Sequence, residues 1–141
     1  PQTEAELRTK LRRREHGAAV IDAAIERAKE LGAVDDLAFA RAWVNDRGLV
    51  RGYSALRIRD ELRRRAVPEA VIDTAIKDLE SRDDLAVATE LARARAQRMP
   101  ATLDPQVVAR RLLGFLARRG YPEALARRVA IQVTGLDREW D

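Results

Sequence analysis

The chain has 141 residues, of which 46% are hydrophobic and 4% aromatic, and its 27 basic and 23 acidic side chains leave a net charge of +4. This length suits one compact domain or a short helical array, and the charge permits an anionic partner without requiring one. Cysteine is absent, no apolar run approaches the roughly 20 residues that cross a bilayer, and no signal peptide is recognisable, so we exclude disulfides, thiolate chemistry and a membrane location and expect a cytoplasmic protein.

The first segment predicts two helices. The Thr-x-x-Glu pattern at Thr3 is a capping box, after which a basic helix should run until Gly17 ends it. The next helix is expected over residues 18–31, with Val20 among its buried side chains, and should close at Gly32. Because the sequence opens abruptly on Pro-Gln-Thr, we expect an N-terminal segment with an opening helix to be missing.

Residues 35–68 predict one complete three-helix unit. Asp36 is the expected N-cap of a helix whose apolar spacing places Trp43 in the core. Gly48 should break the periodicity, and Ser54 should cap a second, strongly basic helix. A third helix follows that one.

The remaining residues repeat the scheme. A long alanine-rich helix should run from the acidic pair at 83–84 to about Arg98, and a linker then ends at Asp104, a helix cap followed by proline. The next helix should stop at Gly120 and hand over to a last helix. Trp140, in the tail, is expected to pack back on the helices.

The sequence repeats itself internally. Residues 11–25 align without gaps to residues 62–76, and residues 116–126 follow the same scheme. A period of roughly 50 residues with three helices predicts an all-α, elongated array of tandem repeats. The expected domains are residues 1–34, which lack their opening helix, residues 35–82 and residues 83–141. The Asp-Asp pairs at 35–36 and 83–84 are better explained as repeated helix caps than as divalent-ion ligands.

Charge follows the repeat. Residues 1–14, 47–66 and 93–119 carry net charges of +3, +5 and +6, whereas the intervening segments are acidic. If the units stack with equivalent helices on one side, the basic helices form a stripe along the array. The alternative is an ordinary solvated face, in which Asp60 and Glu61 each pair with an arginine four residues further on.

Catalytic constellations are missing from the sequence. His16 is the single histidine and is expected to be a cap or a solvated residue, and the two serines, Ser54 and Ser81, lie outside any nucleophile-elbow pattern. No phosphate-cradling glycine loop is present. We therefore predict no enzyme activity, no catalytic residue, no metal and no cofactor.

The central unit resembles a known family. The runs LGAVDDLAFARAWV and RGYSALRIRDELRRRAVPEAVID are similar to those of the RecX family, regulators of the RecA recombinase. The matching residues are Leu31, Gly32, Asp35, Asp36, Phe39, Ala40, Arg41, Arg51, Gly52, Tyr53, Arg57, Ile58, Glu61 and Leu62. Ser54 stands where the family commonly has glycine, a mild departure because serine caps helices well.

The resemblance implies a monomeric negative modulator that binds RecA filaments on single-stranded DNA and inhibits filament extension, ATP hydrolysis and strand exchange. The expected contact residues are Arg12, Arg13, Arg14, Arg47, Arg51, Tyr53, Arg57, Arg63, Arg64, Arg110, Arg111, Arg118 and Arg119. Arg51 and Arg57 match the family pattern, and the other arginines are inferred from exposure. Tyr53 is either packed against the fold or an anchor for a partner. The alternative function is direct binding to single- or double-stranded DNA.

Overall fold

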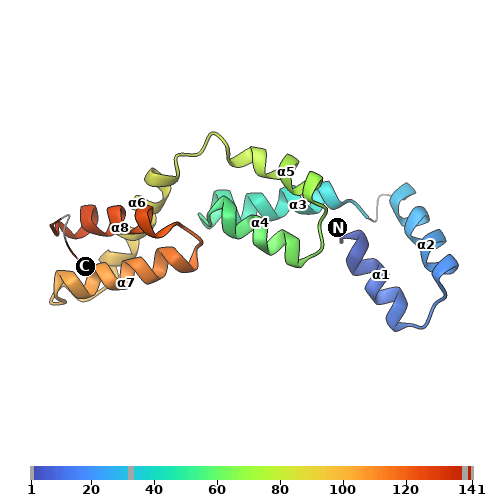
Figure 1. Ribbon diagram of the computed structural model, residues 1–141, viewed down its shortest axis with the longest axis horizontal. Helices are drawn as coiled ribbons and strands as arrows, with labels where there is room; N and C mark the ends of the chain where they lie inside the picture. Colours follow the sequence, from blue (N-terminus) through green and yellow to red (C-terminus); the bar gives the residue numbers. More distant parts are fainter. Residues whose placement is uncertain (1, 32–33, 138–139, 141) are drawn as a thin grey trace.

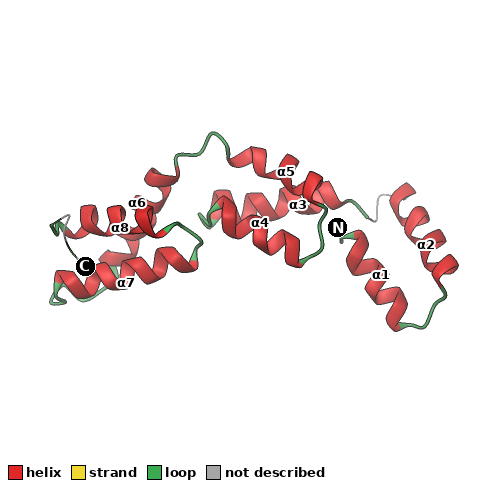
Figure 2. Ribbon diagram, in the orientation of Figure 1, coloured by secondary structure: helices red, strands yellow, loops and turns green. Residues whose placement is uncertain are grey.

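Helices joined by short turns make up the chain, as its alanine, leucine, arginine and glutamate content favours. The computed structural model describes residues 2–31, 34–137 and 140. Within them the α-helices are α1 (Glu4–Arg13), α2 (Ala18–Glu30), α3 (Asp36–Val44), α4 (Ala55–Arg64), α5 (Glu69–Ile76), α6 (Asp84–Gln97), α7 (Pro105–Arg118) and α8 (Glu123–Thr134) (Figures 1 and 2). Among these residues strand-type pairing is limited to one isolated bridge between Gln2 and Val34.

The helices pack in three groups that follow the repeat. α1 packs on α2, α3 contacts α4 and α5, and α6, α7 and α8 contact one another. Figure 1 shows these groups in a row, with the amino-terminal pair at one end and α6 to α8 at the other. The expected all-α, elongated array is confirmed. The domain limits at residues 34 and 82 stay a prediction.

One turn recurs at the same repeat position in each group. Glu15, Ala66 and Gly120 all have positive φ, at 62°, 59° and 90°. This left-handed residue reverses the chain direction after a basic helix, and the following helix begins three residues later in each group. The expectation that Gly17 ends the first helix is therefore wrong, because α1 ends at Arg13 and Gly17 is the N-cap of α2.

The two aspartates of the Asp35–Asp36 pair have different hydrogen-bond partners. Asp35, not Asp36 as predicted, is the N-cap of α3 and accepts from the Ala38 amide at 2.9 Å. Asp36 instead accepts from the Glu4 amide at 2.9 Å, which ties α1 to α3. Asp83 caps α6 in the same way that Asp35 caps α3. The prediction of repeated caps thus holds for the first aspartate of each pair.

Gly48 does not stop its helix. α3 continues into a π-helical turn, Asn45–Val50, that includes Gly48. A Cβ at Gly48 would lie 2.8 Å from Leu79 Cδ2 and 3.0 Å from Ile58 Cδ1, so glycine serves close packing at this position. The helix continues because the core, rather than local propensity, holds it.

Two separate cores stabilise the second and third groups. Ile58, Leu62 and Ile72 are fully buried in one, and Leu112 and Leu116 in the other. Trp140 packs against the second core, as predicted. Trp43 is half-buried at the rim of the first core and stacks with Phe39 at 5.7 Å between ring centroids.

The amino-terminal pair buries less. Ile21 and Ile25 face α1, but Val20 is 58% exposed, so its predicted burial is wrong. The packing partner of α2 is α1, which covers one face of it. The predicted closure at Gly32 lies outside the described residues.

Candidate partner-binding surface

Three basic hollows follow one another along the array. The first, of about 540 Å³, lies between α1 and the end of α4, the second, of about 480 Å³, between α4 and the end of α7, and the third, of about 500 Å³, between α6 and α7. The first and second share Arg64, and the second and third share Arg118. In Figure 1, α1, α4 and α7 lie along the same lower edge of the array. The basic helices therefore form one continuous surface, which we call the basic stripe.

The arginines of α4, in the middle of the stripe, are engaged by carboxylates. Arg59 binds Asp73 at 2.6 Å, Arg63 pairs with Glu69, and Arg64 pairs with Asp60 at 2.8 Å. The predicted pairing of Asp60 with an arginine four residues on is confirmed.

Glu61 departs from the predicted pattern. It pairs with Arg57 at 3.6 Å and accepts from Trp43 Nε1 at 3.2 Å, while Arg65 reaches Glu6 on α1 at 2.8 Å. The predicted Glu61–Arg65 pair is therefore wrong, because Arg65 links the first group to the second. The solvated-face interpretation thus describes most of α4.

The ends of the stripe differ from its middle. Among the described residues, seven of the predicted arginines have no carboxylate within ion-pair distance. Arg119 is half-buried, and the other six are exposed. They are Arg12, Arg13 and Arg14 at the end of α1 and Arg110, Arg111 and Arg118 on α7. These side chains are the ones that an anionic partner can engage without breaking an existing ion pair.

The remaining predicted residues lie where the second group meets the third. We call this contact, between residues 51–57 and residues 118–121, the joint. Arg57 and Arg119 lie over the Tyr53 ring at 4.0 and 5.2 Å, and Arg119 Nη1 donates to the Arg51 carbonyl at 3.0 Å. Arg57 also donates to the Arg118 carbonyl. The structure thus places Tyr53 among intramolecular contacts.

Arg47 and Arg51 lie in and directly after the π-helical turn that precedes this joint in the chain. Arg47 lies 4.4 Å over the Trp43 ring, and both arginines are within 3.5 Å of Asp46. Because they are partly exposed, these contacts are weak and leave them accessible.

Ser54 makes two hydrogen bonds across the joint. Its hydroxyl caps α4 by accepting from the Arg57 amide at 3.1 Å and donates to the Gly120 carbonyl at 2.7 Å. Its amide donates to the Arg119 carbonyl at 2.9 Å. A glycine at position 54 could make neither hydrogen bond of the hydroxyl, one of which connects the second group of helices to the third.

Tyr121 and Arg82 complete the joint. The buried Tyr121 hydroxyl donates to the Gly52 carbonyl at 2.6 Å, and burial raises the pKa of Tyr121, which keeps the hydroxyl protonated. The Arg82 side chain, 8% exposed, donates to the Gly48 and Tyr53 carbonyls and pairs with Asp84. The role of Arg82 could not be predicted from the sequence, because a single arginine before an acidic pair carries no distinguishing pattern.

The pKa shifts follow the ion pairs that connect helices. Lys29, and then Arg8, lower the pKa of Glu4 against the opposing effect of burial, and Arg63 lowers the pKa of Glu69. Both carboxylates thus stay ionised to lower pH than usual. These pairs hold α1 against α2 and α4 against α5.

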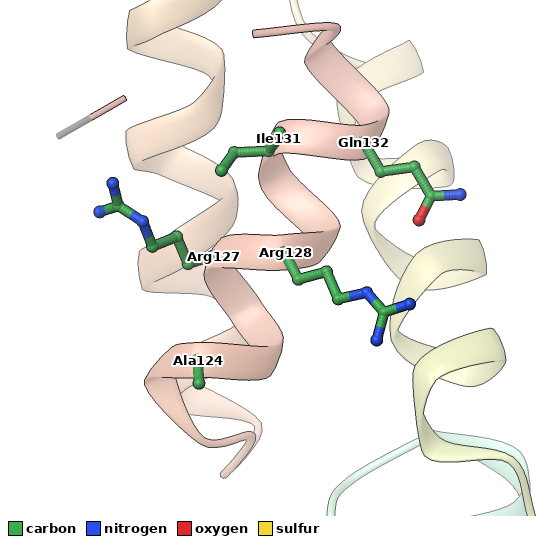
Figure 3. Close-up of a pocket in the computed structure, with 5 residues that line it drawn as sticks. All are labelled: Ala124, Arg127, Arg128, Ile131 and Gln132. Atoms are coloured by element: carbon green, nitrogen blue, oxygen red, sulfur yellow. The ribbon is translucent and has the colours of Figure 1, made fainter. Parts of the chain in front are cut away.

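Another hollow, of about 760 Å³, lies on α8 and is lined by residues of that helix (Figure 3). The figure shows Arg127 and Ile131 on one side of the helix and Arg128 and Gln132 on the other. Arg127 lies 5.5 Å over the Trp140 ring. The polar groups diverge, so we assign no site to this hollow.

In the part of the chain that the structure describes, no three His, Asp or Glu side chains gather as metal ligands would. No described helix is both long and apolar enough to cross a membrane.

Comparison with known proteins agrees with this arrangement. The patterns of the first, second and third three-helix domains of RecX match residues 1–27, 35–76 and 82–130. A protein of Thermobifida fusca named Regulatory protein RecX is 43% identical over 92% of this chain and 69% of its own length. The chain belongs to the RecX family.

Other RecX proteins are similarly related. Regulatory protein RecX of Streptomyces coelicolor is 37% identical over 99% of this chain and 75% of its own length, and that of Mycolicibacterium smegmatis is 38% identical over 89% and 68%. A crystal structure of regulatory protein RecX shares the fold, with a TM-score of 0.68 and 18% identity over 91% of this chain. The chain spans 63% of the length of that solved RecX chain.

Proposed function

We propose that this RecX-family chain is a negative modulator of the RecA recombinase that binds RecA filaments on single-stranded DNA. It limits filament extension and, with it, ATP hydrolysis and strand exchange. The observation that supports this proposal is the continuous basic stripe on a chain whose three units all match RecX domains. A filament repeats its surface at a regular spacing, and a row of repeated basic hollows suits contact at several points along such a partner.

The arginines at the ends of the stripe are the proposed contacts. Arg13 and Arg14 line the hollow between α1 and α4, and among the described residues neither has a carboxylate partner. Charges of this kind govern orientation and association rate more than affinity. In this proposal the protein acts as a cytoplasmic monomer without catalysis of its own.

The test is the single-stranded-DNA-dependent ATPase activity of RecA, measured with increasing amounts of this protein. The salt concentration is set where the protein alone does not bind the DNA. Inhibition under these conditions is the expected result. Full ATPase activity at saturating protein would refute the proposal.

A matched pair of variants locates the contact. Arg13→Ala with Arg14→Ala should require more protein for the same inhibition than Arg27→Ala with Arg41→Ala, although both remove two exposed positive charges. Equal inhibition by the two variants would move the contact away from α1. Reversal of Arg63 is less informative, because a glutamate at that position would face Glu69.

A further inference from the structure

The third hollow of the stripe concentrates positive charge. Five arginines line it: Arg95, Arg98, Arg110, Arg111 and Arg118. No acidic residue is among its described lining residues, and none of the five makes an ion pair within the described part of the chain. Guanidinium groups collected in this way repel one another, and an anion would relieve that repulsion.

The contrast with α4 shows that this arrangement is not a general property of the stripe. On α4, Arg59, Arg63 and Arg64 each have a carboxylate within the molecule. The neighbouring Arg93, on the same helix as Arg95 but outside the hollow, has Glu90 at 3.6 Å. Carboxylates therefore engage Arg93 and the arginines of α4, but none pairs with the five arginines of this hollow among the described residues.

The positions of these arginines on α6 and α7 bring their side chains to the same hollow. Arg95 and Arg98 lie three residues apart at the end of α6, while Arg111 and Arg118 lie on one face of α7, seven residues apart. Between them, at Gly114, an added Cβ would lie 3.2 Å from Arg118 Nη1. The missing side chain at this position leaves room for the Arg118 guanidinium to lie along the helix. Arg95 lies 5.3 Å over the Phe115 ring, which orients it.

The lining of the hollow by arginines from two packed helices indicates the ligand. Packed helices lie roughly 8–10 Å apart, and a nucleic-acid strand carries one phosphate about every 3.4 Å along its helix axis. Arginines from two helices can therefore contact successive phosphates, each by two parallel hydrogen bonds. Among the described lining residues, no Asn or Gln is present to read a base edge.

We propose that the hollow between α6 and α7 is a phosphate-binding site that holds successive phosphates of a nucleic-acid backbone without reading its sequence. Arg95 and Arg98, which sequence analysis did not single out, complete it with Arg110, Arg111 and Arg118. This site is independent of the proposed action on RecA, because it binds nucleic acid in the absence of any other protein.

The experiment measures binding of the full chain to a labelled oligothymidylate across a salt titration, without RecA. Each phosphate contact on a single strand contributes about 0.7 to the slope of log affinity against log salt. Arg95→Ala with Arg98→Ala should therefore lower the slope by about 1.4 and weaken binding about 25-fold at roughly 0.1 M salt. The control, Arg93→Ala with Arg128→Ala, removes the same net charge outside the hollow and should change both quantities much less.

Equal losses in the two variants would overturn the proposal, because net charge alone would then explain binding. Wild-type DNA binding by the Arg95/Arg98 variant would also overturn it, and a loss of RecA-filament binding in that variant would then assign the hollow to an acidic protein surface. Tripolyphosphate serves as a probe of the ligand source. If it competes at concentrations equal to the oligothymidylate phosphates and binds the control but not the Arg95/Arg98 variant, the hollow binds free polyphosphate as well as it binds a strand, and its assignment to a nucleic-acid backbone is overturned.

Discussion

Replacement of Gly120 by alanine should uncouple the second and third units. Gly120 has φ of 90°, and an added Cβ would overlap Ser54 Oγ and lie 2.5 Å from Arg57 Cβ and 3.3 Å from Arg57 Cα. The Arg57 backbone cannot withdraw without moving α4. The joint must therefore either absorb the overlap or open.

The expected cost follows from these contacts. Positive φ costs alanine about 1–2 kcal/mol, and overpacking of this kind costs about 1–3 kcal/mol. Opening the joint instead loses the hydrogen bonds of the Ser54 hydroxyl and amide and of the Tyr121 hydroxyl, each about 1 kcal/mol. Since the two routes have similar costs, Gly120→Ala should lower the free energy of unfolding by about 2–5 kcal/mol.

Gly135→Ala is the matched control. Gly135 has φ of 74°, but nothing lies within 4 Å of its added Cβ, so this variant has only the conformational cost of about 1–2 kcal/mol. The difference in unfolding free energy between the two variants therefore measures the cost of the overlap at the joint.

Urea unfolding followed by tryptophan fluorescence gives the readout, because Trp43 lies against the core of the second unit and Trp140 against that of the third. In backgrounds with one tryptophan replaced by phenylalanine, the two transitions should coincide for the parent chain and separate for Gly120→Ala. Coincident transitions in Gly120→Ala, with a loss of unfolding free energy no greater than that of Gly135→Ala, would show that Gly120 does not couple the two units.

Three further predictions concern single contacts. Tyr121→Phe removes the hydrogen bond to the Gly52 carbonyl and should lower the urea-derived free energy of unfolding by about 1 kcal/mol; an unchanged value would mean that water replaces the hydroxyl. Gly114→Ala should stabilise the protein by about 0.5–1 kcal/mol through helix propensity and so raise the melting temperature, since the flexible Arg118 side chain can move aside. A lower melting temperature would show that the Arg118 side chain is fixed in its position beside Gly114. Because the pKa values of Glu4 and Glu69 are lowered below their usual 4.5, the stability that they contribute is fully present above about pH 4.5 and is lost as the pH falls through the lower folded-state values. Urea midpoints measured against pH should therefore fall less steeply on the acid side for Glu4→Gln with Glu69→Gln, and an unchanged acid limb would contradict this assignment.

The helices and their repeat could be predicted because their signals are local. The apolar spacing of Ile58 and Leu62, the capping serine at 54 and the gapless match of residues 11–25 to 62–76 depend only on near neighbours in the chain. Gly48 shows the limit of such signals. Glycine usually interrupts a helix, but here the packing of Leu79 and Ile58 needs a residue without a side chain within a helix that continues as a π-turn.

The binding surface was predicted as a set of exposed arginines, and its division into engaged and available members was not. The partner of Arg63 is six residues away in the chain, that of Arg59 fourteen, and that of Arg65 fifty-nine. Arg95 and Arg98 join Arg110 and Arg111 only because α6 and α7 pack together. Periodicity places a side chain on a helix face but does not show which helix lies opposite.

Four properties follow from the sequence alone, because composition, periodicity and motifs depend on nearby residues: the chain is helical, repeats every roughly 50 residues, belongs with RecX proteins and alternates basic with acidic helices. Only the tertiary structure decided that Ser54, Gly120 and Tyr121 lock two units together and that five arginines share one hollow without a carboxylate. These features join residues up to 69 positions apart, and their contacts exist only once the helices have packed.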